Sequence, residues 1–97
     1  MFTKAQMAEA LNLVMEINED DTPRVAFFGY AGHVKSLEIN VYPKGWNPRN
    51  RYVITFSDYM DQDAYTEGRT YRGNKNTEIV QYESFDDMLA AVRRVGL

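Results

Sequence analysis

Residues 34–57 read VKSLEINVYPKGWNPRNRYVITFS, and this stretch decides the fold. Its first part, residues 34–42, alternates apolar and polar side chains, which is the two-residue period of a β-strand with one buried face. A loop at residues 43–50, with two prolines and one glycine, precedes a second alternating run at residues 51–57. Because parallel neighbours need long crossovers, so short a loop predicts an antiparallel pair. The apolar positions of the two runs are Leu37, Ile39, Val41, Tyr52, Ile54 and Phe56.

Further strands are expected on both sides of this pair. Residues 24–30 are rich in β-forming side chains and predict a strand, followed by a turn at residues 31–33. The polar segment from residue 58 to residue 76 has no apolar period. We expect its residues 65–71 to be extended, as one arm of a protruding hairpin, with a turn at residues 73–76. Residues 77–82 then predict a fourth strand, so the sheet is an antiparallel meander of three to four strands.

A helix is expected at each end of the chain. Thr3 and Gln6 have the spacing of a capping box, and Pro23 follows the end of the first helix. Ser84 is a suitable N-cap for the second helix, and Gly96 suits the position just past its end. The apolar stripe of the first helix consists of Met7, Ala10, Leu11, Val14 and Ile17. That of the second consists of Phe85, Met88, Leu89, Val92 and Val95.

The order helix, strands, helix predicts one α+β domain that spans residues 1–97. Each helix has one apolar stripe and the sheet needs a covered face, so we expect a two-layer sandwich with both helices on one face. The composition is that of a globular domain, with 44% hydrophobic and 26% charged residues. The chain has no cysteine, no visible signal segment and no apolar run of membrane-spanning length. These features favour a cytoplasmic protein without a membrane partner.

Little in the sequence points to enzyme chemistry. His33 is the only histidine and lies in an expected turn, without a second catalytic group beside it. Asp61 and Asp63 begin like a calcium-binding EF-hand loop, but Thr66 stands where that loop needs glycine and Arg72 where it needs glutamate. We therefore expect no catalytic residues, no metal site and no cofactor.

Two basic clusters contain aromatic side chains. Lys44, Arg49 and Arg51 surround Trp46, and Arg69, Arg72 and Lys75 surround Tyr71. Cations for the phosphates and rings for the bases are what single-stranded nucleic acid requires. The acidic residues between the clusters oppose this interpretation, because their field cancels the basic one unless the fold separates them. These acidic residues are Asp58, Asp61, Asp63 and Glu67.

The chain is also rich in tyrosine, with seven in 97 residues. Tyrosine and tryptophan are enriched where proteins meet, because a ring buries a large area while its polar tip keeps a hydrogen bond. The alternative is that these tyrosines simply fill half-buried sheet positions. Aromatic residues on long loops are less easily explained by packing in the core. We therefore expect the contact surface on the loops at residues 43–51 and 58–75, with Trp46, Tyr65 and Tyr71.

The runs LEINV (residues 37–41) and RYVITFS (residues 51–57), framed by short helices, resemble small phage- and prophage-encoded accessory proteins. Some anti-CRISPR inhibitors share this element order and an acidic contact surface carried on loops. The resemblance implies a non-enzymatic protein that acts by occupying the surface of another protein. The acidic residues 58, 61, 63 and 67 would then mimic phosphates against a basic groove.

Three functions are therefore expected, in this order. The first is a protein-binding module of the phage-inhibitor type, with the two loops as its contact surface. The second is a small domain that binds single-stranded nucleic acid. The third is a homodimer formed through an open sheet edge. The alternative to this homodimer is a monomer. The residues of the nucleic-acid interpretation are Lys44, Trp46, Arg49, Arg51, Tyr71 and Arg72.

Overall fold

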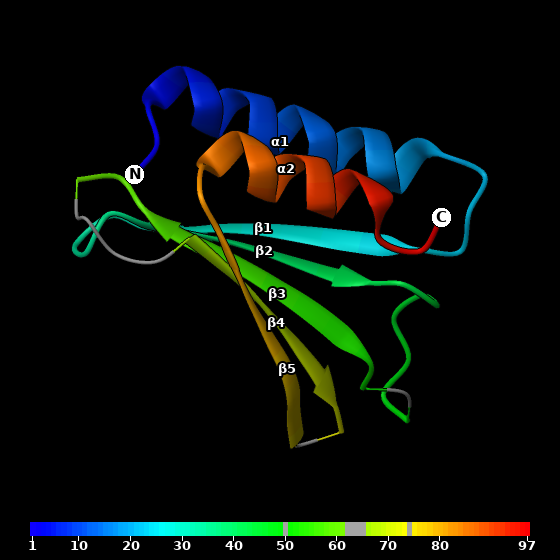
Figure 1. Cartoon of the computed structure of the whole chain (residues 1–97). Helices are drawn as coiled ribbons and strands as arrows, with labels where there is room; N and C mark the ends of the chain where they lie inside the picture. Colours follow the sequence, from blue (N-terminus) through cyan, green and yellow to red (C-terminus); the bar gives the residue numbers. More distant parts are fainter. Residues whose placement is uncertain (50, 62–65, 74) are drawn as a thin grey trace.

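The computed structural model describes residues 1–49, 51–61, 66–73 and 75–97. Five strands lie between two helices along the chain. The elements are α1 (Lys4–Glu19), β1 (Val25–Ala31), β2 (Ser36–Tyr42), β3 (Val53–Tyr59), β4 (Thr66–Arg72), β5 (Lys75–Tyr82) and α2 (Phe85–Arg94). The strands pair in chain order and every pair is antiparallel. Both helices lie side by side on one face of the sheet (Figure 1).

The α+β class and the antiparallel meander are confirmed, but the sheet has five strands rather than three to four. The additional strand is β4, which runs through the polar segment and pairs with β3 on one side and β5 on the other. Its helix-facing positions are Thr66, Gly68 and Thr70, which do not form an apolar run. A strand in the middle of a sheet can lack large apolar residues when neighbouring strands supply the bulk, as Phe56 of β3 does here.

The core lies between the helices and strands β1–β4. Leu37, Ile39 and Val41 of β2 are fully buried, as the alternation of that strand predicts. The expected stripe of α1 is wrong at one position, since Leu11 is 43% exposed and Leu13 is 3% exposed. The reason is that α2 packs beside α1 and buries the flank that carries Leu13.

The expected helix ends are confirmed. Thr3 Oγ1 accepts the Gln6 N–H at 3.1 Å, and the Gln6 side chain accepts the Thr3 N–H at 2.9 Å, which is the reciprocal pattern of a capping box. Ser84 Oγ accepts the Asp87 N–H at 3.0 Å at the start of α2. Gly96, just past α2, has a φ of +79°, a conformation that favours glycine.

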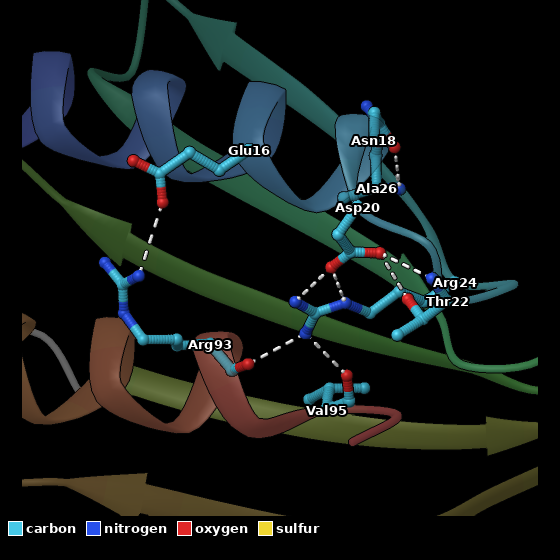
Figure 2. A network of polar contacts seen from close by, with 8 residues as sticks. All are labelled: Glu16, Asn18, Asp20, Thr22, Arg24, Ala26, Arg93 and Val95. Carbon is cyan, nitrogen blue, oxygen red and sulfur yellow. Dashed lines mark hydrogen bonds and ion pairs between the residues drawn. The ribbon is translucent and has the colours of Figure 1, made fainter.

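Arg24 was expected to begin the first strand, but it precedes β1 and is buried, with 7% of its surface exposed. Its Nε and Nη2 donate to the Asp20 carboxylate at 2.9 and 2.6 Å. Its Nη1 donates to the carbonyls of Arg93 and Val95 at 2.7 and 2.9 Å (Figure 2). One guanidinium therefore joins the end of α1, the start of β1 and the end of α2.

Asp20 makes this junction sensitive to pH. Hydrogen bonds from Thr22 and Arg24 hold the pKa of its carboxyl below the ordinary value of 3.8. A lowered folded-state pKa means that the ion contributes stability above the unfolded pKa and loses it as the pH falls through the folded pKa. We expect Asp20→Asn to be less stable than the wild type at about pH 7. The difference should shrink as the pH falls below 3.8 and through the lower folded-state pKa of Asp20.

Urea unfolding at several pH values measures this difference. Asp21→Asn is the matched control, because Asp21 is exposed and forms no ion pair in the described part of the chain. If the difference in free energy of unfolding between the wild type and Asp20→Asn stayed constant down to the lowest pH, the lowered pKa assigned to Asp20 would be contradicted.

Candidate functional site

A hollow of about 380 Å³ opens at the end of the sheet where β2 and β4 finish and β3 begins. The register sets Val53 directly opposite Tyr71, so the loop before β3 and the turn after β4 meet at this end. We call it the aromatic hollow. Its lining consists of Tyr42, Trp46, Asn47, Pro48, Arg51, Val53, Tyr71 and Gly73.

Three aromatic side chains line the hollow. Trp46 leaves 60% of its surface exposed, which is unusual for the largest apolar side chain. The Tyr42 ring is supported from the sheet, where it meets the ring of Phe27 edge-on at 5.8 Å between centroids. Tyr42, Val53 and Tyr71 belong to the sheet face opposite the helices, because they alternate with the buried positions of their strands.

The loop that carries Trp46 is fixed by local contacts. The Gly45 N–H donates to the Tyr42 carbonyl at 3.1 Å, and the Arg49 N–H donates to the side-chain oxygen of Asn47 at 2.9 Å. Gly45 has a φ of +86°, and a Cβ at this position would lie 3.0 Å from the carbonyl oxygen of Pro23. Glycine is therefore required directly before the tryptophan, and the indole is presented by an ordered turn.

Cationic side chains flank the hollow. Arg51 lines it, and the Arg72 guanidinium lies 4.3 Å from the centroid of the Tyr52 ring, within cation–π distance. Lys44, Arg49 and Lys75 are exposed and form no ion pair with another described residue. The two basic clusters recognised in the sequence therefore meet at one end of the sheet, apart from Arg69.

Asp58 was expected in a solvated polar loop, and this expectation is wrong. The third strand runs two residues further than predicted, and Asp58 takes the helix-facing position after Phe56 with no exposed surface. Its Oδ1 accepts the Tyr59 N–H at 2.7 Å and the Met1 ammonium at 3.2 Å. Oδ2 lies 3.2 Å from the same ammonium but accepts no hydrogen bond within the described residues.

The other described acidic residues of this segment also have cationic partners. Asp61 pairs with Lys35 at 3.1 Å, and Glu67 pairs with Arg69 at 3.1 Å. The hydrogen bond and negative charge of Glu67 raise the pKa of Arg69 above its ordinary value. Residues 63 and 65, the predicted Asp63 and Tyr65 contacts, lie outside the described residues.

The fold separates Asp58 and Asp61 from the basic residues at the hollow. In the β3–β4 pair, Ser57 opposite Glu67 marks one end and Val53 opposite Tyr71 marks the other. A seven-residue strand is about 20 Å long, so Asp58 and Asp61 lie far from the hollow along β3. The nucleic-acid interpretation required the fold to separate the acidic residues from the basic ones. The register of the β3–β4 pair separates Asp58 and Asp61 from the hollow.

The sequence did not identify every residue of the hollow. Trp46, Arg51 and Tyr71 were expected and are brought together. Asn47 and Pro48 belong to the expected loop without having been singled out, whereas Tyr42 and Val53 were not expected. The alternation of β3 holds the signal for Val53, since it has the opposite parity to the buried Phe56 and so lies on the open face. The proximity of Pro48 to Tyr71 has no signal in the sequence.

Among the described residues, no group of three or more histidine and carboxylate side chains is placed to hold a metal ion. His33 is exposed in the turn between β1 and β2, the position expected for it. Neither helix in the described part of the chain has the length and apolar character needed to span a membrane.

Comparison with known proteins identifies no relative. No family model matches the chain, and neither a curated protein nor a solved structure matches it. Function is therefore inferred from the geometry, exposure and charge of the aromatic hollow.

Proposed function

We propose that this protein is a non-enzymatic binding module that takes single-stranded nucleic acid at the aromatic hollow. The observation that carries the proposal is the exposed Trp46 beside Tyr42 and Tyr71, in a hollow flanked by cations. Unpaired bases stack on such rings, and the phosphates that follow them lie against the cations.

The hollow has the size and chemistry of a base-binding platform. Its volume of about 380 Å³ is within the range of small-ligand sites, and its rings offer flat faces without a catalytic group between them. Stacking of one base on an aromatic side chain contributes about 1–3 kcal/mol and depends little on sequence. We therefore expect binding that is strong for unpaired bases and weakly selective among them.

The local charge supports an anionic ligand although the whole chain has a net charge of −3. Five cationic residues belong to the two segments that form the hollow. The described acidic residues between these segments, Asp58, Asp61 and Glu67, lie toward the opposite end of the sheet. Phosphate contacts of this kind dominate affinity and make it fall as salt rises. The five cations are Lys44, Arg49, Arg51, Arg72 and Lys75.

The expectation of a phosphate-mimicking inhibitor has less support from these contacts. Of its acidic residues, Asp58 is buried and both Asp61 and Glu67 have a cationic partner. A surface that mimics phosphates needs carboxylates whose charge is available to a partner. A protein partner at the same hollow remains an outcome that the following experiment distinguishes.

The test is binding of a labelled, mixed-sequence DNA or RNA oligonucleotide, followed by fluorescence anisotropy at low salt. We expect Trp46→Ala to weaken binding by about tenfold to a hundredfold, because one stacking platform is lost. Trp46→Phe should retain part of the affinity. Trp46 is the only tryptophan, so its fluorescence in the wild type should also change on binding.

A charge-reversed pair separates a specific site from general attraction. Arg49→Glu with Lys75→Glu should weaken binding and reduce its salt dependence, because phosphate contacts at the hollow are lost. Lys35→Glu with Arg93→Glu changes the net charge equally at exposed positions that do not line the hollow. Equal weakening by the two pairs, or wild-type binding by Trp46→Ala, would refute the proposal. A purified protein that binds the wild type but not Trp46→Ala, where oligonucleotides do not bind, would favour the protein-binding expectation.

A further inference from the structure

The two edges of the sheet differ in how they are protected. The β5 edge carries Lys75 and Glu78, and its pairing with β4 shifts register between Thr70 and Tyr71. Charges and bulges of this kind prevent an edge strand from pairing with another chain. The β1 edge has the sequence VAFFGYA, without charge or proline, and pairs with β2 over all seven residues without a shift. The β1 edge therefore lacks these protections.

One rung of the β1 edge is nevertheless occupied, by a side chain from α1. Asn18 Nδ2 donates to the Ala26 carbonyl at 2.9 Å, and the Ala26 N–H donates to Asn18 Oδ1 at 2.8 Å (Figure 2). The backbone groups of Ala26 thus point away from β2. In an antiparallel ladder this orientation recurs at every second residue, so the groups of Phe28 and Tyr30 point the same way. No contact among the described residues occupies them.

Exposed apolar side chains flank these two open rungs. Leu11 and Met15 of α1 are 43% and 52% exposed, on the flank turned away from α2. Phe27 and Tyr30 of β1 are 48% and 41% exposed. Isolated exposed apolar residues are ordinary, but four around an uncharged, open strand edge indicate a surface that another chain covers.

We propose that a second copy of this chain pairs with β1 in antiparallel orientation, about a two-fold axis at Gly29. Phe28 of each copy then exchanges both backbone hydrogen bonds with Tyr30 of the other. An axis at Phe28 would instead require Ala26, whose groups Asn18 already occupies. The side chain of Asn18 therefore selects the register.

The charges of α1 favour a second copy over an unrelated strand. Lys4, Leu11, Met15 and Glu19 follow one another at helical spacing along one flank of α1, with opposite charges at its two ends. An antiparallel two-fold arrangement directs Lys4 of each copy toward Glu19 of the other. Neither residue forms an ion pair with another described residue.

The exposed area agrees with a weak but specific dimer. A large side chain buries about 150–250 Å² when covered, so four half-exposed ones contribute on the order of 400 Å² from each copy. Two copies bury about 800 Å² through these side chains, and the strand backbones bring the total near the ~1,000 Å² of a small biological interface. The two sheets become one continuous sheet, and both aromatic hollows open on the same face.

Gly29 provides a test that leaves the single chain intact. A Cβ at Gly29 has no atom within 4 Å, and the residue does not have a positive φ. At the two-fold axis, however, two side chains at this position lie directly opposite each other. We expect Gly29→Lys to raise the dimer dissociation constant by up to about fivefold, because like charges directly opposite destabilise a strand pair. Gly29→Thr, the uncharged control, should leave the dimer in place.

Sedimentation equilibrium over a range of concentrations measures these constants, and urea unfolding confirms that each variant folds. Mixing Gly29→Lys with Gly29→Glu should restore pairing as a one-to-one heterodimer, because the opposed charges then attract. A wild type that stays monomeric at the highest concentration would overturn the proposal. So would a dimer that persists in Gly29→Lys but is lost in Ile79→Lys, since Ile79 belongs to the other edge.

Discussion

Replacing Phe56 by alanine should lower the free energy of unfolding by about 3–5 kcal/mol, the largest effect expected in this chain. Phe56 is 1% exposed and lies on β3 between Ile39 of β2 and Gly68 of β4. Its ring also packs against that of Tyr82, with 6.2 Å between centroids. Removal leaves a cavity that cannot collapse, because neighbours on both sides are held by the sheet. Urea unfolding at neutral pH measures the loss.

The same ring explains the glycine in the middle of β4. A Cβ at Gly68 would lie 3.0 Å from two carbons of the Phe56 ring, so Gly68→Ala should destabilise the wild type. In the Phe56→Ala background both ring contacts are absent and only the Tyr82 hydroxyl, at 3.2 Å, stays close, so the substitution should cost less than in the wild type. Gly29→Ala, at an open strand position, is the control for general effects of replacing glycine. Strictly additive effects of Phe56→Ala and Gly68→Ala would contradict this packing.

Arg24→Ala is expected to lower the free energy of unfolding by about 3 kcal/mol, because a buried guanidinium that donates four hydrogen bonds is removed. Asp20 loses both guanidinium hydrogen bonds, and the carbonyls of Arg93 and Val95 lose their donor at the end of α2. A hydrogen bond from a charged donor contributes about 1.5–3 kcal/mol, more than one between neutral groups. The same urea titration measures the loss.

Two variants test whether the stability depends on the forked geometry of the Arg24 guanidinium. Arg24→Lys keeps the charge but cannot reach Asp20 and two carbonyls together, so we expect most of the loss to remain. Arg93→Ala removes an ion pair with Glu16 in which both side chains are 62% exposed, and such pairs contribute at most about 1 kcal/mol. If Arg93→Ala were as destabilising as Arg24→Ala, the role assigned to Arg24 would be wrong.

The helices were largely predictable because their signals are local. The reciprocal bonds of Thr3 and Gln6 and the cap at Ser84 involve residues three positions apart, and the sequence displays them directly. The error at Leu11 has a different origin. Periodicity identifies an apolar face only approximately, and the packing of α2 decides which edge of that face is buried.

The β4 strand was the least predictable element, for a reason that Gly68 illustrates. The space beside Gly68 on the helix-facing side is filled by the ring of Phe56 from the neighbouring strand. β4 therefore carries no apolar period of its own. The extended arm was expected because a structureless loop of this length is unusual in a compact domain, and the turn after it because of the turn-forming residues at Gly73. Pairing on both sides with β3 and β5, which makes the fifth strand, depends on those neighbours.

The candidate site was predictable in its residue types but not in its arrangement. Trp46, Arg51 and Tyr71 were selected because aromatic and cationic residues on loops have little structural reason. Their meeting follows from the β3–β4 register, which also places Asp58 and Glu67 toward the other end. Asp58 was misplaced because a carboxylate in a polar run resembles a loop residue, whereas strand parity places it among the buried positions.

The sequence by itself determined the two capped helices, the antiparallel meander and the loop that presents Trp46. Each of these depends on caps, turns and periods that act within a few residues of the chain. The tertiary structure alone decided the burial of Asp58, the junction at Arg24, the aromatic hollow and the open rungs of β1. These depend on which distant segments lie side by side, and the contacts that fix them join residues far apart in the sequence.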